Sequence, residues 1–142
     1  MIIVDTNVLV ALTDRDDQHH ALCRSWLGTT ESPLLVPSTV LAEACYLIDR
    51  ELGPETEAAF LDDVGTSPDY PYRLVELVNS DLRRMAELVR QYADRRLGGT
   101  DASVVAIAER VGATTVATLN RRDFDNLRPK HAAALDIVPA RR

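Results

Sequence analysis

The first segment of the chain constrains its fold most, because a short apolar run there ends abruptly at an acid. Residues 2–4 are Ile, Ile and Val, and Asp5 follows them. A β-branched apolar run is typical of a strand buried on both faces, as in the middle of a parallel sheet. A helix over residues 8–12 can follow, with Thr6 or Asn7 as its cap. Asp5 is therefore expected at the carboxyl end of a central strand, where open α/β sheets bind ligands, although a plain helix-capping role is also open.

Strand-like and helical segments alternate along the rest of the chain. Further strands are expected at residues 34–36, 72–77, 114–119 and 136–138. Helices are expected at residues 17–28, 38–52, 55–64 and 100–111, from about 80 to a break at 97–99, and as a short turn at 123–124. This alternation predicts an α/β sandwich with a mainly parallel sheet, and the length suits a single domain over residues 1–142.

One predicted helix, from about residue 80 to the break at 97–99, has an apolar stripe at helical spacing. The members expected to face the core are Leu82, Met85, Ala86, Val89 and Ala93. The members expected to face solvent are Arg83, Arg84, Arg90 and Asp94.

The overall charge limits the kind of partner that the chain can have. Its net charge is −6, which disfavours a general nucleic-acid coat. Lys130 is the one lysine among 16 basic residues, and most of the arginines lie in the second half. Arginine forks suit phosphate oxygens, but such runs are also common on solvated helix faces.

Other parts of the sequence indicate where the protein resides. No apolar run reaches the ~18 residues of a membrane span, and no signal peptide is expected before the first strand. Cys23 and Cys45 lack metal-binding spacing and are expected as reduced thiols, as in a cytoplasmic protein. His19 and His20 lie in a polar stretch and are expected to be solvated.

Four acidic residues fall at element ends or along core-facing edges: Asp5, Glu43, Asp101 and Asp123. Right-handed crossovers bring the carboxyl ends of parallel strands to one edge of a sheet, so these acids are expected to converge. Two unit charges ~4 Å apart repel by about 4 kcal/mol at an effective dielectric near 20. Several converging carboxylates therefore need protons or a divalent cation to compensate their charge.

An all-oxygen site without His or Cys favours Mg²⁺ or Mn²⁺ over Zn²⁺. Such a site suits hydrolysis of a phosphodiester, because the cation activates water and offsets charge on the phosphate. The sequence has no GxSxG motif and no glycine-rich phosphate loop, since its one Gly pair is Gly98-Gly99. A receiver-type phosphoacceptor domain is disfavoured because Asp5 stands alone and Lys130 is badly placed. A haloacid-dehalogenase-like phosphatase would need an acid where Asn7 stands.

Three segments resemble PIN-domain ribonucleases, and within them the VapC toxins of bacterial toxin–antitoxin pairs. They are IIVDTNVLVAL, PSTVLAEACYLI and GGTDASVVAIAERVGATTVATLNRRDFDNLRP, in family order and spacing. The resemblance implies a three-layer α/β/α sandwich and Mg²⁺- or Mn²⁺-dependent endonucleolytic cleavage of RNA in the cytoplasm. It also implies a homodimer and a small VapB-like antitoxin that covers the site. Trp26, Tyr46 and Phe60 are candidate antitoxin contacts, with core packing as the alternative.

The resemblance also assigns roles to particular acids. Asp5 matches the first acid of the family, Glu43 the second and Asp101 the third. Asp5 and Asp101 would be the principal metal ligands, and Glu43 would hold a second metal or a metal-bound water.

The last motif departs from the family pattern. Asn120 stands where many relatives carry a fourth acid, and Asp123 follows three residues later. An amide oxygen can coordinate a metal but carries no charge, so the division of the fourth role between Asn120 and Asp123 stays open. A catalytically weak PIN-like module that binds RNA or a partner is the alternative function that Asn120 suggests.

Four further residues flank these acids in the sequence. Thr6 and Thr118 are candidate hydroxyls that support the metal ligands. Arg121 and Arg122 are candidates to bind RNA phosphates, with plain solvation as the alternative.

Overall fold

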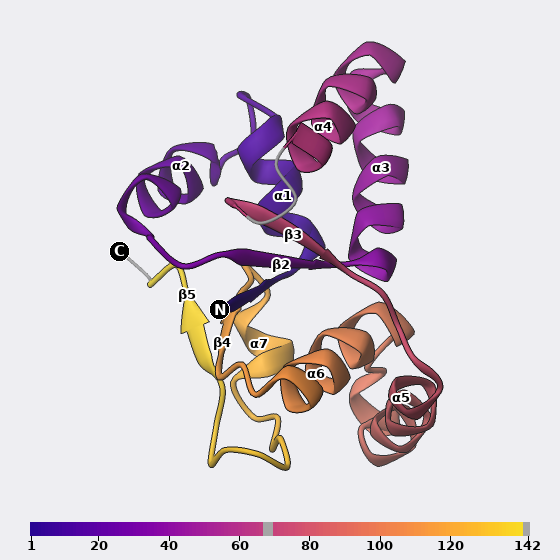
Figure 1. Ribbon diagram of the computed structural model, residues 1–142. Coiled ribbons are helices and arrows are strands. Elements are labelled where there is room, and N and C mark those ends of the chain that lie inside the picture. The colour runs from indigo at the N-terminus through magenta and orange to yellow at the C-terminus, as the bar shows by residue number, and fades with distance from the viewer. Residues whose placement is uncertain (67–69, 141–142) are drawn as a thin grey trace.

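The computed structural model describes residues 1–66 and 70–140. Its described strands form one sheet in the order β3-β2-β1-β4-β5, and every neighbouring pair is parallel (Figure 1). The strands are β1 (Ile2–Val4), β2 (Leu34–Pro37), β3 (Tyr72–Val75), β4 (Thr115–Ala117) and β5 (Asp136–Val138). All five fall where the sequence predicts a strand, although β3 and β4 are shorter than expected.

Helices cover both faces of this sheet, as Figure 1 shows, so the predicted three-layer α/β/α sandwich is confirmed. The first face carries α1 (Thr6–Thr13), α2 (His20–Thr29), α3 (Ser38–Leu52) and α4 (Pro54–Thr66). The second carries α5 (Asn79–Gln91), the 3₁₀ turn η1 (Ala93–Arg95), α6 (Gly99–Val111) and α7 (Arg121–Phe124).

The order of the strands reverses at β1, which lies between β2 and β4. Ile3 pairs with Leu35 of β2 and with Val116 of β4, and all three side chains are buried. At the end of the strand, the N–H of Asp5 donates to the carbonyl of Ala117 at 2.8 Å. The carboxyl ends of β1 and β4 are thus held side by side at the topological switch point, where open α/β sheets bind their ligands.

The helix α6 is buried around much of its circumference, which the predicted stripe of a single face does not anticipate. Every residue from Ala102 to Ala108 is buried. Several of these residues are small, so the helix packs closely against the sheet and against α5. Gly112 ends the helix with φ +75°, a left-handed conformation that glycine adopts without strain.

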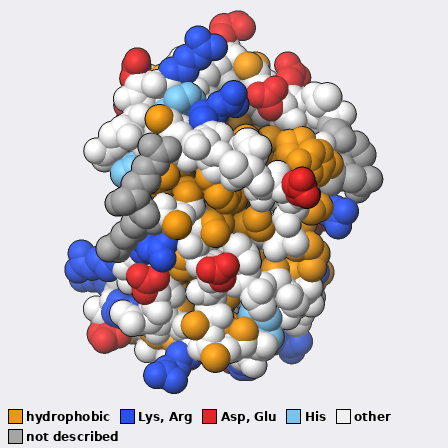
Figure 2. All heavy atoms as spheres, turned by 90° about the vertical axis from the view of Figure 1, so that its left-hand side faces the viewer, with side chains coloured by type: hydrophobic (Ala, Val, Ile, Leu, Met, Phe, Trp, Pro, Cys, Tyr) orange, Lys and Arg blue, Asp and Glu red, His pale blue; other side chains and the backbone are white. Residues whose placement is uncertain are grey.

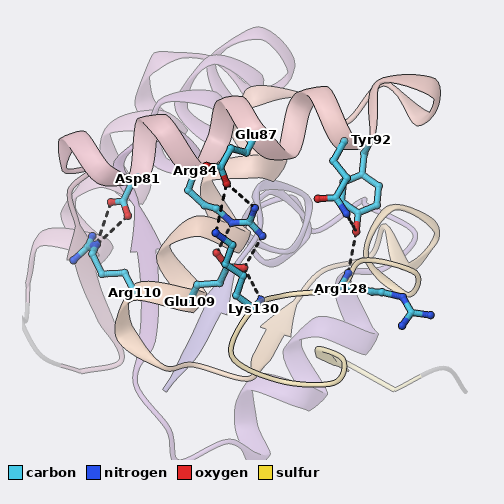
Figure 3. Close-up of polar contacts among 9 residues, drawn as sticks. Asp81, Arg84, Glu87, Tyr92, Glu109, Arg110, Arg128 and Lys130 are labelled. Carbon is cyan, nitrogen blue, oxygen red and sulfur yellow. Dashed lines mark hydrogen bonds and ion pairs between the residues drawn. The ribbon is translucent and has the colours of Figure 1, made fainter.

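The helix α5 is rotated relative to the prediction from its apolar stripe. Leu82 and Val89 are 50% and 38% exposed, whereas Asp81 and Leu88 are buried. The reason is a polar interface between α5 and α6. Arg84 donates from Nε and Nη2 to the two carboxylate oxygens of Glu109 at 2.7 and 3.0 Å (Figure 3). The predicted outward orientation of Arg84 and inward orientation of Leu82 and Val89 are therefore wrong. The inward prediction for Ala93 is wrong as well, because α5 ends at Gln91 and Ala93 is exposed in η1.

The same network holds the loop that follows α7. The N–H of Lys130 donates to Glu109 at 2.8 Å, and the N–H of Arg128 donates to the Tyr92 hydroxyl at 3.1 Å (Figure 3). The Lys130 ammonium also lies 3.5 Å from the carboxylate of Glu87. These contacts fix the chain between α7 and β5 against the α5–α6 pair.

Several smaller features differ from the sequence predictions or refine them. The helix α2 begins at His20 rather than near residue 17. His19 and His20 are half-buried rather than fully solvated, and Nδ1 of His20 lies 2.7 Å from the Ala11 carbonyl. Cys23 and Cys45 are free thiols, as expected. Within residues 1–66 and 70–140, no helix has the length and apolarity needed to cross a membrane.

One face of the molecule gathers hydrophobic side chains. Figure 2 views the side of the sandwich that carries α2 and β5, and hydrophobic groups fill much of its middle, with many of the charged groups toward the rim. Of the aromatic residues singled out from the sequence, Phe60 is buried, Trp26 packs against the core and Tyr46 is 64% exposed. Core packing therefore accounts for Phe60 and Trp26 but not for Tyr46.

Candidate active site

A pocket of about 630 Å³ opens at the switch point of the sheet. Residues from five segments line it: Asp5, Thr6, Asn7, Val10, Asp17, His19, Glu43, Leu47, Gly98, Gly99, Thr100, Asp101, Leu119 and Asn120. Three of the four acids singled out from the sequence, Asp5, Glu43 and Asp101, thus share one cavity. Four carboxylates line the pocket, with no Lys or Arg among its described lining residues.

Asp5 caps a helix and also lines the pocket, so the capping role that the sequence left open does not take it away from the pocket. Its Oδ1 accepts a hydrogen bond from the N–H of Thr6 at 2.8 Å, so it caps α1. Its Oδ2 accepts one from the hydroxyl of Thr118 at 2.7 Å, and the side chain is 4% exposed. Burial raises the pKa of Asp5, the two hydrogen bonds oppose that rise, and the charges of Glu43 and Asp123 add to it.

Two side chains hold the end of β4 against the start of α1. The Thr118 hydroxyl also accepts a hydrogen bond from the N–H of Asn120 at 3.0 Å. Oδ1 of Asn7 accepts one from the N–H of Leu119, also at 3.0 Å. The sequence suggests a helix cap at Asn7, and its contact with a residue 112 positions away has no local signal. Together these contacts fix the backbone that carries Asn120.

Glu43 and Asp101 reach the pocket from near the starts of two different helices. Glu43 lies in the second turn of α3, directly after β2, and Asp101 lies in the first turn of α6. The hydroxyls of Thr39 and Ser103 are 2.6 Å apart and join the same two helices near their starts. This contact joins α3 and α6 close to the turns that carry the two acids.

Asp101 carries the clearest electrostatic signature of the site. Burial, followed by the charges of Asp5, Asp123 and Glu43, raises its pKa from 3.8 to about 7. A carboxyl whose pKa is raised to about 7 by burial and then by its acidic neighbours marks a site in which negative charge is poorly compensated by protein groups. A cation is the natural compensation.

The donor set fits a hard divalent cation. Carboxylate and amide oxygens line the pocket, and the buried hydroxyl of Thr6 has no hydrogen-bond partner among the described residues. No three His, Cys, Asp or Glu side chains of the described ranges are close enough to hold one ion jointly. This is compatible with Mg²⁺, which usually keeps several waters and binds through one or two carboxylates.

Asn120 and Asp123 occupy different places relative to the pocket. Asn120 lines it, whereas Asp123 lines a neighbouring cleft of about 650 Å³. The Asn120 amide donates to Oδ2 of Asp123 at 2.5 Å. Asp123 is nevertheless near enough for its charge to raise the pKa values of Asp5 and Asp101.

The two arginines singled out from the sequence have different surroundings. Arg121 donates from Nη1 to the carbonyls of Ile137 and Pro139 at 3.2 and 3.4 Å, so it joins α7 to the end of β5. Arg122 is exposed and borders both the cleft beside Asp123 and a smaller pocket that Asn120 shares.

Asp17 and His19 also line the acidic pocket, which the sequence did not indicate. Oδ1 of Asp17 accepts a hydrogen bond from the N–H of His19 at 2.7 Å, and this turn lies just before α2. Neither residue belongs to a strand–helix junction, so no periodic pattern could place them at the pocket.

Comparisons with known proteins agree with this geometry. The PIN domain family matches residues 2–129. Ribonuclease VapC26 of Mycobacterium tuberculosis is 30% identical over 138 residues, which cover 97% of this chain and 100% of that protein.

Solved structures with the same fold are more distant in sequence. VapC20 of M. tuberculosis, a toxin that cleaves the sarcin–ricin loop, matches with TM-score 0.75 at 20% identity, over 82% of this chain and 87% of that one. VapBC2 of Rickettsia felis, bound to a DNA fragment from its promoter, matches with TM-score 0.70 at 18% identity, over 97% and 98%. With the family match spanning most of the sequence and a relative aligned over its full length, the chain belongs to the PIN domain family.

Proposed function

We propose that this protein is an endoribonuclease of the VapC type, which hydrolyses phosphodiester bonds of RNA with the help of Mg²⁺ or Mn²⁺. One observation carries the proposal: Asp5, Glu43 and Asp101, which lie far apart in the sequence, converge on one pocket. The 30% identity to Ribonuclease VapC26 over the whole length supports RNA as the substrate. The raised pKa of Asp101 supports a cation as the missing counter-charge.

Each acid has a distinct role in this proposal. Asp5 and Asp101 hold the cation, and Glu43, which is exposed at the pocket rim, orients the attacking water or a second ion. When bound, the divalent cation lowers the pKa of water and offsets charge on the phosphate and the leaving oxygen. Thr118 and the N–H of Thr6 hold the Asp5 carboxylate in one orientation, so its oxygens are preorganised for the ion.

Asn120 takes the fourth position in the pocket, with Asp123 behind it. The hydrogen bond from the Asn120 amide to Asp123 leaves the amide oxygen of Asn120 as its free acceptor. That oxygen coordinates the ion or its water without adding charge. A PIN-like module that binds RNA without cutting it is the alternative that this neutral residue favours.

The proposal includes an antitoxin and a second copy of the chain as partners. Related folds occur in toxin–antitoxin complexes, among them that of R. felis. The hydrophobic groups on the face that carries α2 and β5 offer a surface of the kind that protein partners cover (Figure 2). The proposed location is the cytoplasm, because free thiols such as those of Cys23 and Cys45 are typical of proteins in a reducing compartment.

The test is cleavage of RNA by the purified protein. With Mg²⁺ or Mn²⁺, the wild type should cut a mixture of cellular RNAs, and a chelator should stop the reaction. Asp5→Asn and Asp101→Asn should each abolish cutting, whereas Asp136→Asn, at an exposed acid outside the pocket, should leave it unchanged.

Two results would contradict the proposal. Cutting that persists in chelator or survives both substitutions would exclude the carboxylate-held cation. Tight RNA binding by the wild type without turnover at any Mg²⁺ or Mn²⁺ concentration would favour the non-cutting module instead.

A further inference from the structure

A second cleft adjoins the acidic pocket and has the opposite chemistry. Its volume is about 650 Å³, and it meets the acidic pocket at Asn120, which lines both. Three arginines line it, Arg95, Arg96 and Arg122, together with the acids Asp94 and Asp123. We refer to this cavity as the arginine cleft. Every described residue that lines it is polar.

Arg95 is built into the wall of the arginine cleft. Its Nη2 donates to the backbone carbonyl of Asp123 at 3.0 Å, and its guanidinium lies 4.9 Å from the ring centroid of Tyr92. A cation over a tyrosine face and a hydrogen bond to a carbonyl hold the guanidinium in place. Arg95 thus connects η1 to α7, the helix whose Asp123 lies beside the acidic pocket.

Arg96 and Arg122 are free to contact a ligand. Both are exposed, and neither forms an ion pair or hydrogen bond through its side chain with any described residue. Arg96 ends η1 with φ +53°, a left-handed conformation that is uncommon for a side chain of this kind. The arginine cleft therefore combines two arginines without a side-chain partner among the described residues and one, Arg95, that is held in place.

The contrast between the two cavities suggests how a nucleic-acid strand crosses them. The acidic pocket holds four carboxylates, which repel phosphates unless cations fill it. The arginine cleft holds three guanidiniums against two carboxylates, one of which accepts from the Asn120 amide. Guanidinium forks match phosphate oxygens in two-point contacts, so this cleft attracts phosphates with or without the cation.

We propose that the arginine cleft binds backbone phosphates of the RNA strand on one side of the cleaved bond, with Arg96 and Arg122 as the contacting residues. The inference rests on the proposed ribonuclease function and adds a binding site to it. Because the two cavities meet at Asn120, a strand whose cleaved phosphate lies in the acidic pocket leads its next phosphates into the arginine cleft. Arg95 is a positioning residue that keeps the wall of this cleft against Asp123.

An acidic protein segment is the other ligand that arginines attract. Protein partners are usually anchored by buried aromatic or aliphatic groups, and the described lining of the arginine cleft includes no apolar residue against which such an anchor could pack. A charged backbone with solvated bases needs none. The polar lining therefore favours an RNA strand.

The decisive experiment measures RNA binding separately from cutting. All variants carry Asp101→Asn, so that the RNA stays intact. This substitution breaks no hydrogen bond, because the carboxylate of Asp101 forms none with the described residues. A labelled single-stranded RNA of random sequence is titrated with protein at several salt concentrations. Arg96→Gln and Arg122→Gln are compared singly and together, and Arg83→Gln with Arg90→Gln, two exposed arginines of α5 outside both cavities, forms the matched control.

The double variant should bind RNA at least tenfold more weakly at low salt. The slope of log affinity against log salt should fall by about 0.7 for each lost phosphate contact, or roughly 1.4 in total. The control pair should change neither quantity by as much. In the cutting enzyme with native Asp101, Arg96→Gln and Arg122→Gln should raise KM several-fold and leave kcat nearly unchanged.

The outcomes separate this inference from the proposed function. If the wild type cuts RNA but the double variant binds and cuts like the control pair, the inference is overturned and the function stands. If the wild type neither binds nor cuts RNA, both fail.

Discussion

The hydroxyl of Thr118 donates a hydrogen bond to Oδ2 of Asp5 at 2.7 Å, joining two residues that lie 113 positions apart. The bond links the residues that directly follow the paired strands β1 and β4. The same hydroxyl accepts the N–H of Asn120 at 3.0 Å, so it orients a carboxylate and a backbone turn together. The Thr118 side chain therefore holds Asp5 and the backbone of Asn120, two parts of the proposed metal site, in fixed positions.

Thr118→Val should weaken metal binding at the site although all of its acidic residues remain. The substitution keeps the shape of the side chain but leaves the buried Asp5 carboxylate without one donor, so we expect a stability loss of about 1–3 kcal/mol. Loss of a group that orients a metal ligand typically costs 10–100-fold in metal affinity or activity. Thermal unfolding and titration with Mn²⁺ measure the two effects. Thr118→Ser keeps the hydroxyl and should restore most of both, and equal defects in the two variants would contradict the role assigned to the hydrogen bond.

The raised pKa of Asp101 predicts a pH-dependent stability in the absence of metal. Its pKa is about 7 in the folded chain against an ordinary value of 3.8, so the folded state binds this proton more tightly. The resulting stability is fully present below pH 3.8 and is lost as pH rises through 7. In chelator, Asp101→Asn should therefore melt about 2–4 °C above the wild type at pH 8, as expected for roughly 1 kcal/mol at a partly solvated site. At pH 4 the two should melt alike, and a difference that is the same at both pH values would refute the titration of Asp101 as its cause.

Divalent cations should stabilise the folded protein through the same acids. A ligand at 100 times its Kd adds about 2.7 kcal/mol to the stability, if it binds the folded state alone. Mn²⁺ should therefore raise the melting temperature of the wild type by several degrees, and Asp5→Asn should remove the rise. Asp136→Asn is the control and should keep it. An equal rise in Asp5→Asn would assign the binding to some other site.

The fold was predictable from the sequence wherever a local pattern decides it. The run of residues 2–4 and the β-branched run of β4 both became buried, adjacent parallel strands. The convergence of Asp5, Glu43 and Asp101 followed from the position of each near a strand end or a helix start. The parallel arrangement alone brings such positions to one edge of the sheet.

The failures occurred where contacts between distant segments decide the structure. The apolar stripe of α5 predicted that Leu82 and Val89 are buried. In the structure, Asp81 and Arg84 face α6 instead and form hydrogen bonds with it. Pairing with Arg110 and Glu109 makes this polar face the buried one, and no periodicity within α5 contains that information. Asp17 was missed for a related reason, because the turn between α1 and α2 alone carries it to the pocket.

The pair of Asp81 and Arg110 should be a principal source of stability at the α5–α6 interface. Nε of Arg110 lies 3.1 Å from both carboxylate oxygens of Asp81, whose side chain is 2% exposed against 33% for Arg110 (Figure 3). Arg110→Met leaves a buried carboxylate with the N–H of Val78 as its remaining partner, and we expect a cost of about 3 kcal/mol.

Asp81→Asn should cost less than Arg110→Met, because the exposed part of Arg110 can return to water while an asparagine still accepts from Val78. In urea unfolding, the double variant should lose clearly less than the two single losses combined, since each substitution removes the same interaction. Arg50→Ala breaks a pair that is exposed on both sides, Arg50 with Glu51, and should leave the unfolding midpoint unchanged. Additive losses at Asp81 and Arg110 would mean that the two residues act independently, and that packing rather than charge pairing sets the rotation of α5.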